Sequence, residues 1–174
     1  MNKLVEMMSG LGHTPEVVNY GTVMMEEASR LHAVKSRDDM RKLPVEDQRK
    51  LQVYAASRIS EIQKEFVVID THLFIATREG FWPGMPMDVL QALKPTHLIL
   101  VSATIEEIKK RRESDATRHR ERTAADALGA EIEAAKAFLY ASSVISGAAA
   151  LIVNNATDHV EAAAKQIIAA LVSV

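Results

Sequence analysis

The sequence predicts a single α/β domain over residues 1–174, a three-layer fold in which helices cover both faces of a parallel sheet. Short β-branched segments alternate along the chain with longer segments of helical periodicity, the order typical of parallel sheets. The 174 residues are 48% hydrophobic and 25% charged, which suits one core of ordinary size. Segment 66–72 is an apolar run that ends in Asp70, Thr71 and His72. This is the pattern of a strand buried on both faces that reaches the edge of such a sheet.

The first part of the chain is expected to lead to this strand through alternating helices and a further strand. Turn signals at Gly10 and Gly12, a Ser36 cap followed by two acids, and Pro44 before a long apolar stripe set the boundaries. The expected elements are a helix over 2–9, a strand over 16–20, a helix over 22–31 with Met24, Ala28 and Leu31 inward, a short helix after Ser36, and a helix from Pro44 with Leu51, Ala55, Ile59 and Ile62 inward.

The second part repeats the alternation. Two prolines and two glycines predict a loop over 77–86, and Thr104-x-x-Glu107 predicts a capping box. The expected elements are a helix from Pro86 to Leu93, a strand over 97–102, a helix after Thr104, the longest helix over 124–146 with Leu128, Ile132, Ala135 and Leu139 inward, a strand over 149–154, and a final helix that Asp158 caps, with Val160, Ala164, Ile167 and Leu171 inward.

Asp70 is the first candidate for chemistry. Ligands of open α/β sheets bind at the carboxyl ends of the strands, and a carboxylate there is typical of the acid that holds Mg²⁺, directly or through water, in phosphoryl-transfer proteins. A strand that ends in Asp is also common where the Asp caps a helix or opens a loop, so the pattern alone leaves both interpretations open.

Segment 109–122 is strongly basic, with seven Lys and Arg among its fourteen residues. If Arg111 ends a helix and Arg118 and Arg120 follow in the next turn or loop, three guanidinium groups can converge on one phosphate chain, with Glu113 and Asp115 orienting them. A solvated surface is the alternative for such a run. Nucleic-acid binding is disfavoured, because the net charge is −2 and no aromatic residues interleave the basic ones.

Composition excludes several classes of protein. There is no cysteine, so disulfides, thiolate metal sites and a cysteine nucleophile are excluded. No apolar run approaches the roughly 18 residues of a membrane span, and the first residues lack a signal peptide's pattern. We therefore expect a cytoplasmic protein without membrane partners.

Six blocks of the sequence resemble the archaeal-type adenylate kinases, in the order and near the spacing of that family. The blocks are Asn19-Tyr20-Gly21, residues 37–43, residues 69–72, residues 83–86, residues 115–120 and residues 152–154. The resemblance covers almost the whole chain. It implies a P-loop nucleoside-monophosphate-kinase fold, ATP and AMP as substrates with ADP as product, Mg²⁺ as cofactor, and a homotrimer.

The resemblance also implies roles for individual residues. The phosphate-clamping catalytic arginines would be Arg111, Arg118 and Arg120 within an arginine-rich lid segment, 111–123. Asp70 would sit at the Mg²⁺, through water. The helices of 36–64 would form the AMP side, and the residues expected to bind AMP are Tyr20, Gly21, Arg41, Thr71, His72 and Arg78. Asn154 and Asn155 would lie near the ATP base.

The sequence departs from the family pattern in two places. Ala76 stands where the family usually has a basic residue, and Arg78 is expected to reach the same AMP phosphate. G-x-x-x-x-G-K-[ST] and the strand before it do not occur in the 174 residues. In the family that strand lies between those ending at Asp70 and Ser102, so these two strands would face a gap or pair directly. We expect Met1 to be an internal residue of a longer protein, and a shortened natural protein is the alternative.

Three functional hypotheses follow. The first is an adenylate kinase whose activity in this form depends on the missing loop. The second is a non-catalytic AMP-binding or assembly protein, and the third is a kinase of another small acceptor. The last is disfavoured because Arg41 and the Tyr20-Gly21 turn match the AMP side.

Overall fold

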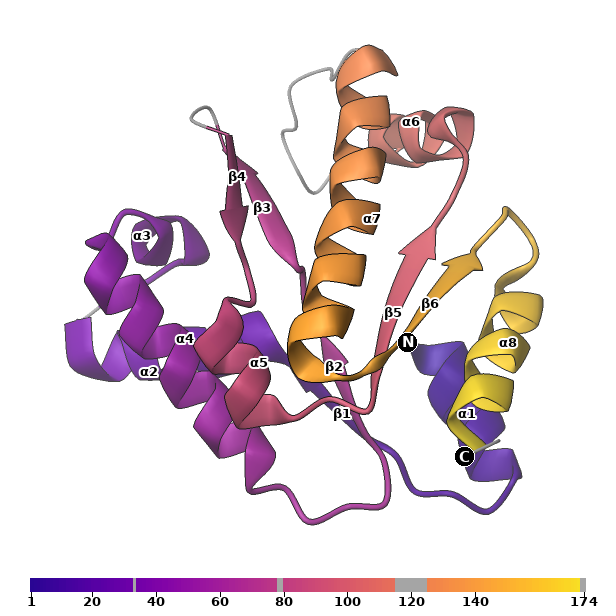
Figure 1. Cartoon of the computed structure of the whole chain (residues 1–174), viewed down its shortest axis with the longest axis horizontal. Helices are drawn as coiled ribbons and strands as arrows, with labels where there is room; N and C mark the ends of the chain where they lie inside the picture. The colour runs from indigo at the N-terminus through magenta and orange to yellow at the C-terminus, as the bar shows by residue number, and fades with distance from the viewer. Residues whose placement is uncertain (33, 78–79, 115–124, 173–174) are drawn as a thin grey trace. The chain divides into compact units, whose positions relative to one another are not determined.

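The structure is a computed structural model that describes residues 1–32, 34–77, 80–114 and 125–172. Within them the chain forms two compact units, Met8–Pro95 and a second unit of Met1–Met7 with Thr96–Val174. Each unit is taken by itself below (Figure 1). The expectation of a single domain over 1–174 stays a prediction.

The unit Met8–Pro95 is built on a parallel strand pair and a cluster of helices. Its elements are β1 (Glu16–Asn19), α2 (Tyr20–His32), α3 (Arg37–Arg41), α4 (Val45–Ser60), β2 (Val67–Asp70), β3 (Phe74–Thr77), β4 (Gly80–Pro83) and α5 (Met87–Leu93). Ser36 caps α3 by accepting the Asp39 N–H, and Pro44 and Pro86 immediately precede α4 and α5. These boundaries confirm the predicted helices to within a residue or two.

The core of this unit lies between α2, α3 and α4. Ala28, Met40 and Leu51 are buried together with Val34, and Met24, Met25 and Leu43 pack against them. Leu31, predicted to face inward, is 55% exposed, so that prediction was wrong. Ala28 and Leu51 both have less than 2% of their surface exposed. The core-facing side of α2 is therefore centred on Met24 and Ala28, and Leu31 lies at its edge.

The predicted loop over 77–86 is wrong in its first half. β3 and β4 form an antiparallel hairpin in which Ile75 pairs with Trp82 and Ala76 with Phe81. The rings of Phe74 and Phe81 meet edge to face with centroids 5.0 Å apart. Aromatic and β-branched residues favour strands even in segments as short as these. The proline and glycine pattern concealed them because Gly80 and Pro83 lie at the ends of β4.

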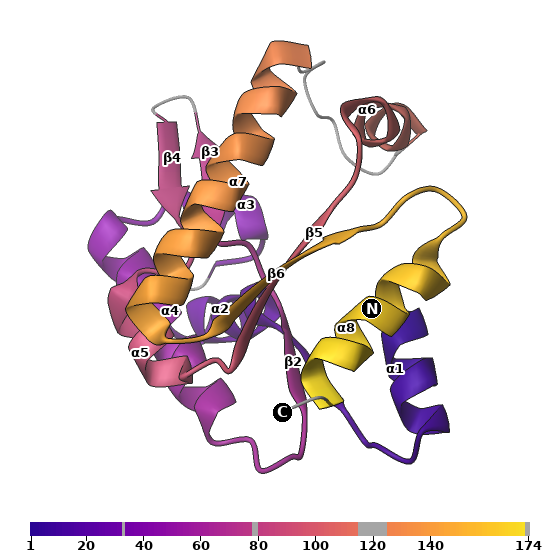
Figure 2. The ribbon, with the colours of Figure 1, turned by 45° about the vertical axis from the view of Figure 1, so that its right-hand side comes forward.

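The second unit has the same parallel character. It holds the start of α1 (Asn2–Gly10), then β5 (His97–Ser102), α6 (Ile105–Ser114), α7 (Ala125–Ser146), β6 (Ala149–Asn154) and α8 (Val160–Val172). β5 and β6 pair in parallel over six residues, from His97 with Ala149 to Ser102 with Asn154. Figures 1 and 2 show α7 and α8 on opposite sides of this pair, with α1 beside α8. Leu128, Leu139 and Val153 are almost fully buried in this layered arrangement.

The start of α8 corrects the predicted Asp158 cap. Asp158 has φ 63°, in the left-handed region, and the helix begins two residues later at Val160. The His159 N–H donates to the Ala156 carbonyl oxygen in a turn, so the residue before the helix is His159. Val160, predicted inward, is 51% exposed, whereas Ala164 is buried as predicted.

The described strands pair only in twos, β1 with β2, β3 with β4, and β5 with β6. Val67, Val68 and Ile69 of β2 are half-buried, which corrects the expectation of a strand buried on both faces. A strand with a ladder partner on one side leaves part of its surface accessible. Within the described part of the chain, no helix combines the length and apolar character needed to cross a membrane.

Candidate active site

Asp70 lies at the carboxyl end of β2, directly opposite Asn19 at the end of β1. The parallel register pairs these two residues, and the Asn19 Nδ2 donates to Asp70 Oδ2 at 3.0 Å. The Asp70 side chain is exposed. The structure thus places the predicted metal-side carboxylate at the sheet edge, where ligands of α/β proteins bind.

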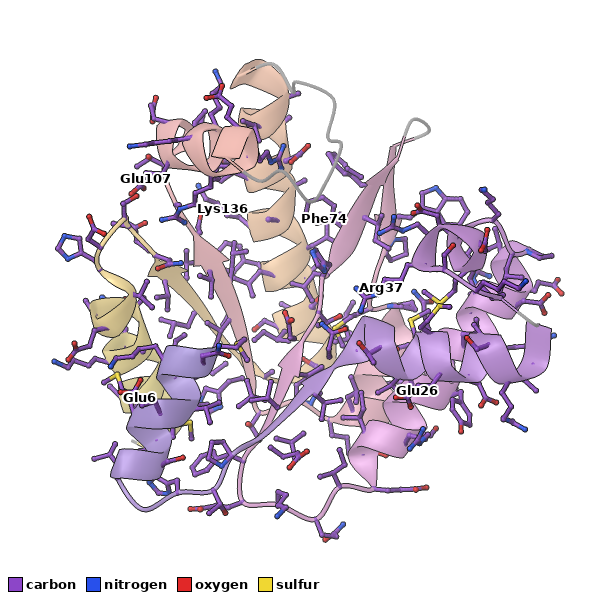
Figure 3. The ribbon with its side chains drawn as sticks, turned by 180° about the vertical axis from the view of Figure 1, so that it is seen from behind. Glu6, Glu26, Arg37, Phe74, Glu107 and Lys136 are labelled. Atoms are coloured by element: carbon purple, nitrogen blue, oxygen red, sulfur yellow. The ribbon has the colours of Figure 1, made fainter. Side chains whose placement is uncertain are left out.

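Asn19 and Arg37 are the polar residues at this edge to which the sequence patterns gave no role. The Arg37 guanidinium donates to Asn19 Oδ1 at 2.9 Å and to Thr22 Oγ1 at 3.0 Å, so α3 is tied to the start of α2. The Arg37 side chain is labelled in Figure 3. Gly21 lies against this group, because a β-carbon at Gly21 would be 3.6 Å from the Arg37 Cζ. Arg37 stands in one of the blocks named above, and that block was the only signal for it.

The residues predicted for AMP binding have different surroundings. Tyr20 is buried and its hydroxyl donates to the Gln52 carbonyl oxygen. Burial raises the pKa of this hydroxyl well above its ordinary value, so Tyr20 stays a neutral donor anchoring α2 to α4. The exposed Arg41 donates to Asp38 Oδ1 at 3.0 Å. Thr71 is half-buried and His72 is exposed, both just after Asp70. Their roles in AMP binding stay predictions.

In the other unit, Arg111 and Asn155 are in contact. The Arg111 guanidinium donates to the Asn155 carbonyl oxygen at 2.7 Å, across 44 positions of sequence. Asn154 is the last residue of β6 and is exposed, whereas the Asn155 Oδ1 atom is buried and has no hydrogen-bond partner among the described residues. A predicted phosphate-clamping arginine at the end of α6 thus contacts a predicted base-side residue in the loop after β6. Arg112 instead pairs with Glu131 of α7 at 2.8 Å.

Glu107, one turn before Arg111 on α6, holds the same loop. Its carboxylate accepts the Thr157 N–H at 2.6 Å and the Thr104 N–H at 3.1 Å, and the Thr104 hydroxyl accepts the Glu107 N–H at 3.2 Å. The capping box is therefore confirmed, and it extends to the loop after β6. Backbone hydrogen bonds from Thr157 and Thr104 lower the pKa of Glu107 from 4.5 to about 2.

Glu107→Gln is expected to lower the melting temperature at pH 7 by about 3 °C, because a charged acceptor is replaced by a neutral one. The lowered pKa means that this stabilisation is complete above about pH 4.5 and is lost as the pH falls towards 2. The difference between natural chain and variant should therefore shrink over that interval, as followed by circular dichroism. Glu106→Gln, which removes the same charge from the same helical turn, is the control and should show a smaller difference with no such convergence.

Three predicted site residues, Arg78, Arg118 and Arg120, lie outside the described residues, as does most of the lid segment 111–123. No cluster of three or more His, Cys, Asp or Glu able to hold a metal occurs in the part of the chain that the structure describes. A single carboxylate such as that of Asp70 is compatible with a Mg²⁺ ion that is shared with substrate. Mg²⁺ commonly takes one or two carboxylates together with water and phosphate oxygens.

Comparison with known proteins gives relatives for almost the whole chain. It is 37% identical over 171 residues to the adenylate kinase of Methanocaldococcus jannaschii, covering 98% of this chain and 89% of that protein. The chain belongs to the adenylate kinase family. The adenylate kinases of Methanopyrus kandleri and Thermoplasma volcanium are 36% and 38% identical over 156 and 152 residues, with 88% and 87% of this chain and 82% and 83% of the relatives covered.

A family model described as an AAA domain also matches residues 1–129. Together with the parallel strand pairs, this match confirms the predicted P-loop nucleoside-monophosphate-kinase type of α/β fold. It also confirms the family resemblance that the six sequence blocks indicated. As an adenylate kinase homologue, the chain is a nucleoside-monophosphate kinase.

Proposed function

We propose that this protein catalyses the reversible, Mg²⁺-dependent transfer of a phosphoryl group from ATP to AMP, giving two ADP. The observation that carries the proposal is the 37% sequence identity to an adenylate kinase, in an alignment that covers 98% of the chain. The geometry is compatible with it, because a carboxylate and an arginine gather at the carboxyl ends of β1 and β2 and a second arginine lies against the loop after β6.

Each group has a separate task in this proposal. Arg111, with Arg118 and Arg120, binds the charge that develops on the transferring phosphoryl group, for which guanidinium forks are suited. Asp70 would hold Mg²⁺, which when bound would neutralise phosphate charge. Tyr20, Gly21, Arg41, Thr71, His72 and Arg78 form the AMP side, and Asn154 and Asn155 lie near the ATP base.

A coupled assay of ADP formation tests the proposal directly. The intact mass of the protein from its native cells, compared with 19.2 kDa, first fixes the natural length at which the assays are made. Mg²⁺-dependent turnover of ATP with AMP at that length supports the proposal. Binding of AMP by calorimetry without turnover would favour the non-catalytic alternative, and turnover only with another acceptor would favour a different kinase.

We also propose a cytoplasmic homotrimer. The exposed apolar side chains of α7, Tyr140 at 55% and Val144 at 85%, support self-association, although they do not fix its order. Light scattering should give about three times the chain mass, and a monomer would contradict the proposal. Fractionation of native cells should place the protein in the cytoplasmic extract.

A further inference from the structure

The side chain of Asn19 joins the carboxylate of Asp70 to the guanidinium of Arg37. Its Nδ2 donates to Asp70, and its Oδ1 accepts from Arg37. We propose that Asn19 is a positioning residue for the kinase reaction, which fixes the orientation of the Asp70 carboxylate and ties it to Arg37. The inference rests on the proposed function for the role of Asp70, but the geometry that it claims can be tested without activity.

The orientation of the Asn19 amide is determined by its neighbours. Oδ1 lies 3.0 Å from the backbone nitrogen of Thr22, 3.0 Å from the Thr22 hydroxyl and 2.9 Å from the Arg37 guanidinium. A backbone N–H and a guanidinium can only donate, so the atom facing them must be the amide oxygen. The amide nitrogen must then face Asp70, whose carboxylate can only accept when ionised. A flipped amide would break at least three of these bonds.

Charge makes this arrangement directional. The positive end of the amide dipole faces a carboxylate, and the negative end faces a guanidinium, so both hydrogen bonds are charge-assisted. The register of β1 against β2 places the Asn19 and Asp70 backbones opposite each other. With Oδ2 of Asp70 held by Asn19, the carboxylate can rotate less freely. Its other oxygen is then presented in one direction, which suits a metal-bound water.

Asn19→Asp isolates the contact with Asp70. The new carboxylate still accepts from Thr22 and Arg37, but it can no longer donate to Asp70. Two carboxylates about 3 Å apart repel each other, so the variant loses this hydrogen bond and is destabilised.

Melting curves measure this loss. We expect a melting temperature about 4 °C below that of the natural chain at pH 7.5. Gln63→Glu is the control, since it adds the same charge to an exposed site in the same unit, where the Gln63 side chain donates to the Glu61 carbonyl oxygen. It should lower the melting temperature by less than about 2 °C.

The double variant Asn19→Asp/Asp70→Asn, which swaps the two side chains, distinguishes the effect on stability from the effect on turnover. It again pairs an amide with a carboxylate across the two strands and keeps an acceptor for Arg37. The melting temperature should return to within about 1 °C of the natural value at pH 7.5. The carboxylate has nevertheless moved to the neighbouring strand, so turnover should stay at least tenfold below that of the natural chain.

Turnover of the single variant completes the test. Asn19→Asp should lower kcat by about 10- to 100-fold, while the dissociation constant for AMP, measured by calorimetry, changes less than about twofold. Equal losses in kcat and AMP affinity would overturn the role in positioning Asp70, and so would full activity of the exchanged pair. A melting temperature of Asn19→Asp equal to that of the natural chain would overturn the geometry itself. If the natural chain showed no turnover, the proposed function would fail, and the melting curves would still decide whether Asn19 holds Asp70.

Discussion

Arg111→Ala is expected to lower kcat for ADP formation about a thousandfold while changing the KM for AMP less than about threefold. Arginines that bind the transferring phosphoryl group act mainly on the transition state, and their loss is typically worth three or more orders of magnitude. Arg111 lies in the last turn of α6, and its guanidinium is 2.7 Å from the Asn155 carbonyl oxygen. Steady-state kinetics with AMP and ATP varied in turn measure the effect.

Two further variants show whether the charge or the guanidinium group of Arg111 is responsible for the loss of kcat. Lys110→Ala removes a positive charge from the adjacent, exposed position of the same helix and should leave kcat within about twofold. Arg111→Lys keeps the charge but loses the planar fork, and it should recover little of the rate. A raised KM for ATP with unchanged kcat would contradict the catalytic assignment. It would show instead that Arg111 only holds the loop through Asn155.

Local signals in the sequence were sufficient for most of the elements. Thr104 and Glu107 of the capping box are three positions apart, and the structure shows their reciprocal hydrogen bonds. Pro44 and Pro86 stand immediately before α4 and α5 because a proline at a helix start loses no hydrogen bond. Such signals depend only on neighbouring residues, so they can be read without knowledge of the fold.

The contacts at the candidate site depend on distant parts of the chain. Asn19 and Asp70 are 51 positions apart and meet only because β1 and β2 pair in one particular register. Arg111 reaches Asn155 across 44 positions. Strand patterns placed Asp70 at the end of one predicted strand and Asn19 near the end of another, over 16–20, but no local pattern specifies which strands are neighbours or how they are aligned. The β3–β4 hairpin escaped prediction for a different reason, because Gly80 and Pro83 at the ends of β4 gave the pattern of a loop.

Gly84→Ala is expected to destabilise the chain by about 3 kcal/mol, the upper end of the usual cost of overpacking. A β-carbon at Gly84 would lie 2.2 Å from the His72 carbonyl oxygen and 3.2 Å from its carbonyl carbon. These are backbone atoms, which cannot move aside as a flexible side chain can. Gly84 is buried, and its N–H donates to the Leu73 carbonyl oxygen at 2.9 Å, so the two segments are held at this close distance.

The consequence reaches the candidate site, because His72 lies two residues after Asp70. Relieving the clash must displace the segment that follows β2, so turnover should fall together with the melting temperature. Gly129→Ala is the matched control: the nearest atom to its added β-carbon is Ile105 Cδ1 at 3.9 Å, and the residue lies inside α7. Alanine is the better helix former, so this change should stabilise by about 0.5 to 1 kcal/mol. Chemical denaturation of both variants gives the comparison, and equal stabilities would contradict the close packing of Gly84 against His72.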